Sequence, residues 1–217
     1  MLIKKTLLTM NKITDITPQT NHKDRCSVYI NGKFAFGISD FDLLRLSLKT
    51  GQELTEAELD EIMYALDETK CQDYANNLVC ARMYTEKELK KKLVAKKFSE
   101  KVIKTVLSRL SEYGYIDDKA YAEAYIAEVK QKYGVYKIRQ KLFEKGVPDR
   151  VIDECLAELD NKDTAVNQLK IKLRNKPVRA EDKQKMLRFL AQKGFAYDEA
   201  YDAIRIYMEE FNDIYDE

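Results

Sequence analysis

Residues 89–110 read LKKKLVAKKFSEKVIKTVLSRL, and residues 138–159 read IRQKLFEKGVPDRVIDECLAEL. A shift of 49 residues superposes the two stretches, and most of the ten pairs given at the end of this paragraph hold the same residue in both. Self-similarity at a fixed period is typical of repeat proteins, so each stretch is predicted to belong to one unit of a tandem array. The matched pairs are Leu89/Ile138, Lys92/Lys141, Leu93/Leu142, Lys96/Lys145, Phe98/Val147, Val102/Val151, Ile103/Ile152, Val106/Cys155, Leu107/Leu156 and Leu110/Leu159.

A third, diverged copy follows at a shift of 97 residues, where Leu89, Leu93, Phe98, Ile103, Val106 and Leu107 map onto Met186, Leu190, Phe195, Ala200, Ala203 and Ile204. Each copy is predicted to hold a leading helix, a short helix and a third helix. The leading helices are expected at residues 71–84, 118–133 and 161–174. A unit of about 45 residues has a marginal core, so the units are expected to pack in series as an elongated, curved array with a concave binding face.

The predicted ends of the short helices follow from helix-capping chemistry. Gly146 and Gly194 suit the left-handed position after a helix, and Lys97 occupies that position in the first copy. Thr85 and Glu88 form a predicted capping box at the start of the first short helix. These signals define where each short helix begins and ends.

A different pattern precedes the repeats. Residues 25–39, RCSVYINGKFAFGIS, predict a β-hairpin, because Asn-Gly at 31–32 is the preferred pair of a type I′ turn. Ser39 and Asp40 are expected to cap a helix that ends near Gly51, and Thr55 with Glu58 is a capping box for a second helix to about Thr69. Beyond Cys71 the apolar spacing is helical throughout.

The predicted fold class is therefore mainly α: three tandem three-helix repeats form an elongated curved array, preceded by a small β-hairpin and two helices. The predicted divisions are 1–70 for the hairpin and helices, 71–116 for the first repeat, 117–160 for the second and 161–217 for the third. Only 7 Gly and 3 Pro among 217 residues argue against an all-β fold. Met10 is a plausible start besides Met1, because the patterned sequence begins just after it.

Composition excludes several classes of protein. Hydrophobic residues make up 45% and charged residues 35% of the chain, which is typical of water-soluble globular proteins. No apolar run approaches the roughly 20 residues of a membrane-spanning helix, so no membrane association is expected. Four cysteines without C-x-x-C spacing predict reduced thiols and a cytoplasmic location. His22 is the only histidine, so no metal site and no cofactor are predicted.

The sequence contains few features that indicate a catalytic site. The nucleotide-binding, hydrolase and metalloprotease motifs are missing from the sequence. The acidic pairs Asp117-Asp118 and Asp153-Glu154 could hold Mg²⁺ in a nuclease, but helix capping and solvation explain them better. We therefore predict no catalytic residue and no enzymatic activity.

Positive charge is concentrated locally although the net charge is only +1. Residues 71–116 carry 10 basic and 5 acidic residues, which is compatible with a groove that binds a polyanion, although a solvated helix face looks the same. Recurrence of cations on corresponding helices favours one extended patch. The candidate nucleic-acid or filament-binding residues are Lys90, Lys91, Lys92, Lys96 and Lys97 in the first copy, Lys137, Arg139, Lys141 and Lys145 in the second, and Lys170, Lys172, Arg174 and Lys176 in the third.

Tyrosines cluster at the junction of the first two copies. They are Tyr113, Tyr115, Tyr121, Tyr125, Tyr133 and Tyr136. Aromatic rings can stack on single-stranded bases. Because the chain has no Trp and only 8 Phe, tyrosine must also fill core space, and packing is the favoured interpretation.

Residues 110–122, LSEYGYIDDKAYA, and residues 134–147, GVYKIRQKLFEKGV, resemble the RecX family of regulators of the RecA recombinase. The first-copy residues 85–98, the pair Gly194-Phe195, and the hairpin followed by FDLLRLSLKTGQELT share the resemblance, which covers nearly the whole chain after Lys12. The sequence departs from the family pattern at two positions. Lys97 stands where the later copies have glycine, and Lys141 stands beside Leu142 where an acidic residue would be typical. These changes affect local helix ends and charge only.

The resemblance implies three helical units bound along the groove of the RecA–DNA filament. It also implies suppression of ATP hydrolysis, strand exchange and co-protease activity in recombination and the SOS response. The implied partners are RecA filaments and single- and double-stranded DNA, and a monomer is expected. Two alternatives stay open: a general helical DNA-binding protein without a RecA-specific role, and a metal-dependent nuclease, which the scarcity of histidine disfavours.

Overall fold

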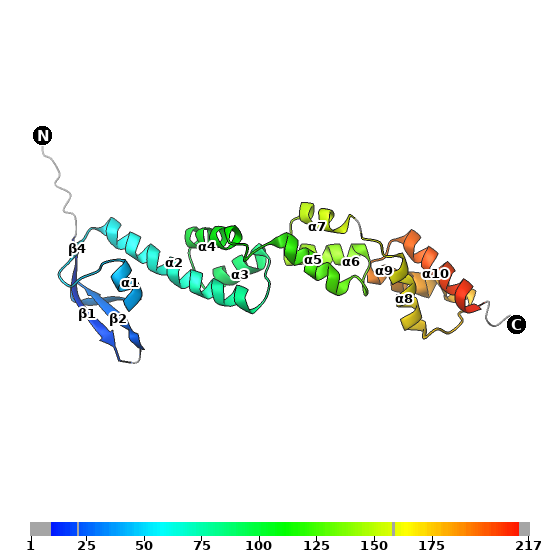
Figure 1. Ribbon diagram of the computed structural model, residues 1–217, viewed down its shortest axis with the longest axis horizontal. Helices are drawn as coiled ribbons and strands as arrows, with labels where there is room; N and C mark the ends of the chain where they lie inside the picture. The colour runs from blue at the N-terminus through cyan, green and yellow to red at the C-terminus, as the bar shows by residue number, and fades with distance from the viewer. Residues whose placement is uncertain (1–9, 21, 158, 213–217) are drawn as a thin grey trace, which may run out of the picture. The chain divides into compact units, whose positions relative to one another are not determined.

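The computed structural model describes residues 10–20, 22–157 and 159–212, so the two possible start sites are not distinguished. The chain divides into two compact units: the first comprises residues 1–77 and 93–106, and the second residues 78–92 and 107–217. The first unit contains a four-stranded antiparallel sheet in the order β3-β2-β1-β4 (Figure 1). Its strands are β1 (Asn11–Gln19), β2 (His22–Ile30), β3 (Lys33–Ser39) and β4 (Glu53–Leu54).

The predicted hairpin is confirmed as β2–β3. Asn31 and Gly32 have φ of 51° and 78°, the positive values that a type I′ turn requires. Strands β1 and β4 were not predicted. β1 carries Pro18 and has few apolar residues, and β4 has only two residues, so neither shows a strong strand pattern.

Helix α1 (Asp40–Arg45) covers part of this sheet and is capped as predicted, because the Ser39 hydroxyl accepts a hydrogen bond from the Asp42 N–H. It is shorter than predicted. Ser47 adopts a positive φ of 51°, which turns the chain so that Leu48 enters the core. The predicted end near Gly51 was therefore wrong.

Helix α2 (Glu56–Ala81) begins with the predicted capping box: the Thr55 N–H donates to Glu58 Oε2 at 2.8 Å, and the Glu58 N–H donates to Thr55 Oγ1 at 3.2 Å. The predicted break near Thr69 is absent. No Gly or Pro interrupts the helix, and the Thr69 hydroxyl donates to the carbonyl of Ala65 without disturbing it. The predicted division at 70/71 thus lies inside one continuous helix.

The remainder of the described chain is helical, with no strand after Leu54, which confirms the mainly α fold with three three-helix repeats. The helices are α3 (Glu86–Ala95), α4 (Glu100–Glu112), α5 (Asp118–Val129), α6 (Val135–Lys145), α7 (Asp149–Leu156), α8 (Lys162–Leu173), a 3₁₀ turn η1 (Ala180–Asp182), α9 (Lys183–Lys193) and α10 (Tyr197–Asn212). The elongated, curved arrangement of the repeats stays a prediction.

The apolar positions that define the repeat form the cores. Ile138, Leu142 and Ile152 are fully buried in the second repeat, which consists of α5, α6 and α7. Leu190 and Ala200 are buried in the third, which consists of α8, α9 and α10. The apolar residues that recur at helical spacing in the sequence therefore form the cores of the second and third repeats.

Within the second unit, the short helices meet end to end. The N–H groups of Gly134 and Tyr136, at the start of α6, donate to the carbonyls of Lys193 and Gly194 at the end of α9, at 3.0 and 3.1 Å. The Thr85 hydroxyl, at the start of α3, donates to the carbonyl of Lys145 at 2.7 Å. Groups left unpaired at one helix end are thus satisfied by the next helix, which fixes the register between repeats.

Candidate nucleic-acid interface

Helix α3 presents lysines to solvent on the side opposite its two buried leucines, next to the exposed side chain of Val94. Leu89 and Leu93, four residues apart, are both 0% exposed. Lys90, Lys91 and Lys92 lie between them in the sequence and are exposed. Lys96 and Lys97 follow the helix and are also exposed, so the structure brings the five first-copy candidates onto or next to one helix.

Aromatic rings support three cations near this face. Lys92 Nζ lies 5.9 Å from the ring centre of Tyr84, and Lys96 Nζ lies 5.1 Å from that of Tyr74. The Arg82 guanidinium sits 3.6 Å from the centre of the Tyr84 ring. Cation–π contacts of this kind restrain the side chains without neutralising them, so the charges of Lys92 and Lys96 remain available to a polyanion, whereas Arg82 also lies 3.5 Å from the carboxylate of Glu88.

Lys145 of α6 joins two repeats instead. Its ammonium donates a hydrogen bond of 2.9 Å to the carboxylate of Glu88 on α3, and this bond raises the pKa of Lys145. Glu88 also lies 3.5 Å from Arg82. The predicted capping box is consequently only half formed: Thr85 Oγ1 accepts from the Glu88 N–H at 3.1 Å, but the Glu88 carboxylate turns toward these cations.

The other second-copy candidates also have intramolecular contacts. Arg139 forms an ion pair with Asp153 of α7. Lys137 donates to Gln140 Oε1 at 3.1 Å, and Lys141 Nζ lies 5.4 Å from the ring centre of Tyr133. Arg139 and Lys145 are therefore partly neutralised, whereas Lys137 and Lys141 keep their full charge.

The third-copy candidates lie on a different helix from the one that the recurrence predicted. Lys170 and Lys172 belong to the leading helix α8, and Arg174 and Lys176 follow it. Lys170 pairs with Glu210 of α10 at 2.7 Å. The proposed correspondence with α3 and α6 was wrong because the basic run in the sequence precedes the short helix. The short helix α9 has its own cations, which sequence reasoning missed: Lys183, Lys185, Arg188 and Lys193.

The acidic pairs cap helices and form ion pairs. Asp117 accepts from the N–H groups of Lys119 and Ala120 at the start of α5, and Asp118 accepts from the Glu86 N–H at the start of α3. Burial raises the pKa of Asp118. Asp153 and Glu154 face Arg139 and Arg150. No cluster of three or more potential metal ligands occurs among residues 10–20, 22–157 and 159–212.

The tyrosine cluster divides into two groups. Tyr121, Tyr125 and Tyr133 pack against the core of the second repeat, as the packing interpretation predicts. Tyr113, Tyr115 and Tyr136 are exposed.

No helix in the described part of the chain is long and apolar enough to cross a bilayer.

Family models match in the same order as the structural elements. Residues 11–55 match the RecX N-terminal domain, and residues 71–110, 117–156 and 160–204 match the first, second and third RecX three-helix domains. A curated protein of Clostridium tetani, "Regulatory protein RecX", is 32% identical over 88% of this chain and 91% of its own length. The chain belongs to the RecX family.

Other RecX proteins support the assignment. The "Regulatory protein RecX" of Clostridioides difficile is 33% identical over 87% of this chain and 92% of its own length. A solved structure, "Crystal structure of regulatory protein RecX", matches with a TM-score of 0.67 and 29% identity over 90% of this chain and 99% of that one. A RecX structure from Lactobacillus salivarius, at 24% identity and a TM-score of 0.60 over 67% of this chain and 98% of that one, shows the same fold.

The RecX models also clarify the boundary inside α2. The first three-helix model begins at residue 71, so this RecX chain uses the second half of one continuous helix as the leading helix of its first repeat. The N-terminal model ends at residue 55, where α2 is capped. The helix thus belongs to both parts of the chain.

Proposed function

We propose that this protein regulates the RecA recombinase by binding along the RecA–DNA filament and suppressing ATP hydrolysis, strand exchange and co-protease activity in recombination and the SOS response. The partners would be the RecA filament and single- and double-stranded DNA. The protein would act as a cytoplasmic monomer without catalysis of its own. The observation that carries the proposal is the exposed basic face of α3 in a chain of RecX type.

Two physical features support filament binding. The five α3-associated lysines, Lys90, Lys91, Lys92, Lys96 and Lys97, can neutralise phosphates and release their counterions. Tandem repeats can present several weak contacts to neighbouring protomers, and linked contacts bind more tightly than separate ones. Lys137, Lys141, Lys172, Arg174 and Lys176 are proposed as secondary contacts. Arg139, Lys145 and Lys170 already bind carboxylates and would contribute less.

The test is single-strand-dependent ATP hydrolysis by the cognate RecA, with the protein titrated from far below to equal molarity and DNA sites in excess. A non-cognate DNA-dependent ATPase is the control. Inhibition confined to RecA supports the proposal. If both enzymes slow only when the DNA is saturated, the protein is a general DNA-binding protein instead.

Charge reversal locates the interface. Replacing Lys90, Lys91 and Lys92 with Glu should weaken binding to an oligonucleotide by more than tenfold and flatten its salt dependence, because about three phosphate contacts are lost. Folding should be unaffected, since Leu89 and Leu93 remain in place. Lys130, Lys132 and Lys162, exposed cations outside this face, provide the matched triple control. Equal loss in both triple variants would contradict a localised basic interface.

A further inference from the structure

The same position in each repeat carries a different chemistry. The short and third helices align across the copies, so that Arg139 and Asp153 of the second repeat correspond to Leu187 and Tyr201 of the third. In the first repeat the corresponding residues are Lys90 and Lys104. The same alignment position therefore holds an opposite-charge pair in the second repeat and two largely apolar side chains in the third, while the sequence of the first repeat has two lysines there.

In the second repeat, this alignment position is bridged by charge. The guanidinium of Arg139 on α6 pairs with the carboxylate of Asp153 on α7. This contact joins the two helices across their exposed edge. At this position the second repeat therefore presents charged groups where the third presents Leu187 and Tyr201.

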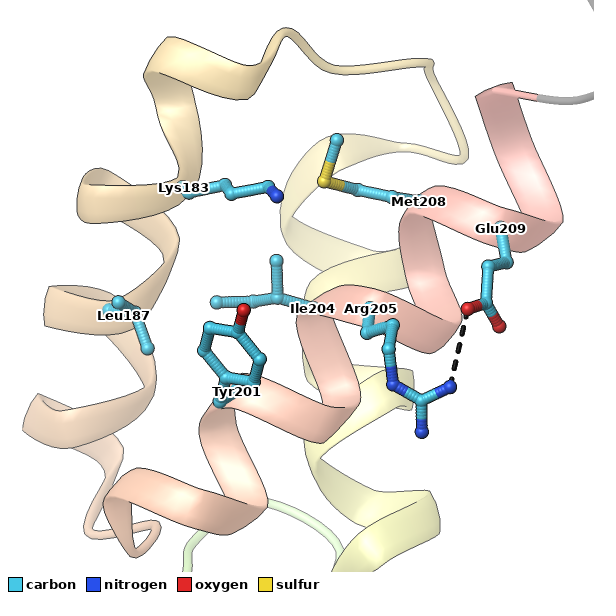
Figure 2. Close-up of a pocket in the computed structure, with 7 residues that line it drawn as sticks. All are labelled: Lys183, Leu187, Tyr201, Ile204, Arg205, Met208 and Glu209. Carbon is cyan, nitrogen blue, oxygen red and sulfur yellow. Dashed lines mark hydrogen bonds and ion pairs between the residues drawn. The ribbon is translucent and has the colours of Figure 1, made fainter.

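In the third repeat, the position is open. A cavity of about 230 Å³ lies between α9 and α10 (Figure 2). Its apolar lining comes from Leu187, Tyr201, Ile204 and Met208, and the Tyr201 side chain is 53% exposed. Helix α10 is twice as long as α7, with 16 residues against 8, and its additional turns provide Met208. An apolar cavity of about 150 Å³ can hold benzene, so this one can take a large apolar side chain.

The charges around the opening indicate the kind of ligand. Arg205 is already occupied, because its guanidinium lies 3.2 Å from Glu209 and 3.6 Å from Asp202. The Lys183 side chain extends over the opening (Figure 2), and no carboxylate in the described residues pairs with it. A ligand segment with one apolar side chain for the cavity and one carboxylate beside it for Lys183 would match this arrangement. The lining is mainly apolar and holds Glu209 beside Arg205, so it favours a protein side chain over a phosphate backbone at this opening.

We propose that the α9–α10 groove is a docking site for a protein segment that inserts one large apolar side chain and places an adjacent carboxylate against Lys183. The inference rests on the proposed function, which supplies the partner: a segment on the protein surface of the RecA filament. The chain then divides its main contacts, with DNA phosphates on the lysines of α3 and the protein segment in the α9–α10 groove. Buried apolar anchors surrounded by polar residues provide most of the energy of such interfaces.

The experiment introduces the ion pair of the second repeat at the corresponding position of the third repeat, in order to close the α9–α10 groove. The variant Leu187→Arg with Tyr201→Asp introduces the ion pair that the fold already accommodates between α6 and α7. The control Gln184→Arg with Gln192→Asp adds the same charges at exposed positions of α9 that do not line the cavity. Fluorescently labelled full-length proteins are titrated with cognate RecA filaments on oligo(dT) and, separately, with oligo(dT) alone.

The groove variant should bind filaments about tenfold or more weakly than the control, while its affinity for oligo(dT) alone is unchanged. Lys183→Glu tests the same site without altering an apolar contact and should weaken filament binding several-fold, which keeps the test decisive if the double variant folds poorly. Equal filament binding by the control, the groove variant and Lys183→Glu would overturn the inference. Failure of the unmodified protein to bind filaments would instead refute the proposed function.

A second copy of the chain is the competing occupant. Sedimentation velocity over a hundredfold range of concentration measures self-association directly. Dimerisation that the groove variant abolishes would identify the groove as a contact between copies and overturn the inference. A monomer at every concentration agrees with docking of a different protein.

Discussion

The ends of the short helices adopt one backbone conformation in two different environments. Lys97, Gly146 and Gly194 follow α3, α6 and α9 with φ of 65°, 91° and 88°. A Cβ atom at Gly194 would collide with the backbone of Lys137, and one at Gly146 would collide with the side chain of Lys87. In all three repeats a residue in the left-handed conformation ends the short helix. Glycine is required only at Gly146 and Gly194, where the first turn of the short helix of the preceding repeat packs against it.

The largest effect is expected for Gly194→Ala. Alanine is strained at this φ and would displace the start of α6, so we expect a loss of about 3 kcal/mol in the stability of the second unit. Urea unfolding followed by circular dichroism measures this loss. Hydrogen exchange of the Tyr136 amide, which donates to the Gly194 carbonyl, should accelerate.

Gly146→Ala sharpens this comparison because the three nearest atoms belong to the side chain of Lys87, from its Cβ to its Cδ, and not to the backbone of α3. Its effect should be smaller, at about 2 kcal/mol, because backbone strain is joined by a clash that a shift of the Lys87 side chain relieves in part. If it destabilised the protein as much as Gly194→Ala, close approach of the backbone would not explain the requirement for glycine.

Lys97→Gly is expected to have the opposite sign. Glycine relieves the strain of a lysine at positive φ, so the protein should gain up to about 1 kcal/mol, partly offset by the greater entropy of the unfolded chain. The midpoint of urea unfolding is the measurement. Lys96→Gly, one residue earlier, is the control and should not stabilise the protein. A clear loss in Lys97→Gly would mean that its side chain makes a structural contact.

The smallest effect concerns the ion pair between Lys145 and Glu88. The pKa of Lys145 is raised in the folded protein, so its stabilising contribution is complete below the ordinary lysine pKa and disappears as the pH rises through the raised value. Between pH 9 and 12 the wild type should lose about 0.2–1 kcal/mol more stability than Lys145→Met. Lys132→Met, which removes an exposed lysine, should follow the wild type. Parallel curves for all three proteins would show that the pair contributes nothing.

Much of the fold could be predicted from residues whose signal is local. The Asn31-Gly32 turn, the Thr55 cap and the helical spacing of apolar residues such as Leu89 and Leu93 act over a few residues, and the structure confirms them. The candidate cations were found in the same way, and those of α3 lie together. Their role in binding stays a prediction.

Other features escaped prediction because they depend on residues far apart in the chain. β4 forms because β1 pairs with it. Lys145 is a predicted binding residue, but its ammonium donates a hydrogen bond to Glu88, 57 residues away in the chain. Lys170 and Lys172 lie on α8, inside the predicted leading helix 161–174, so they do not correspond to the cations on the short helices α3 and α6. The α9–α10 cavity depends on Leu187 and Met208, which are ordinary apolar residues in the sequence.

The sequence by itself determined the repeat, its period, the apolar residues of the repeat cores and the ends of the short helices, because hydrophobic periodicity and capping are short-range properties. Only the tertiary structure decided which cations are neutralised, how α9, α6 and α3 meet end to end, and which repeat has an open groove. Ion pairs, cavities and backbone contacts between repeats depend on the distances between side chains that folding brings together. Similar repeat sequences can therefore form similar bundles with different surfaces.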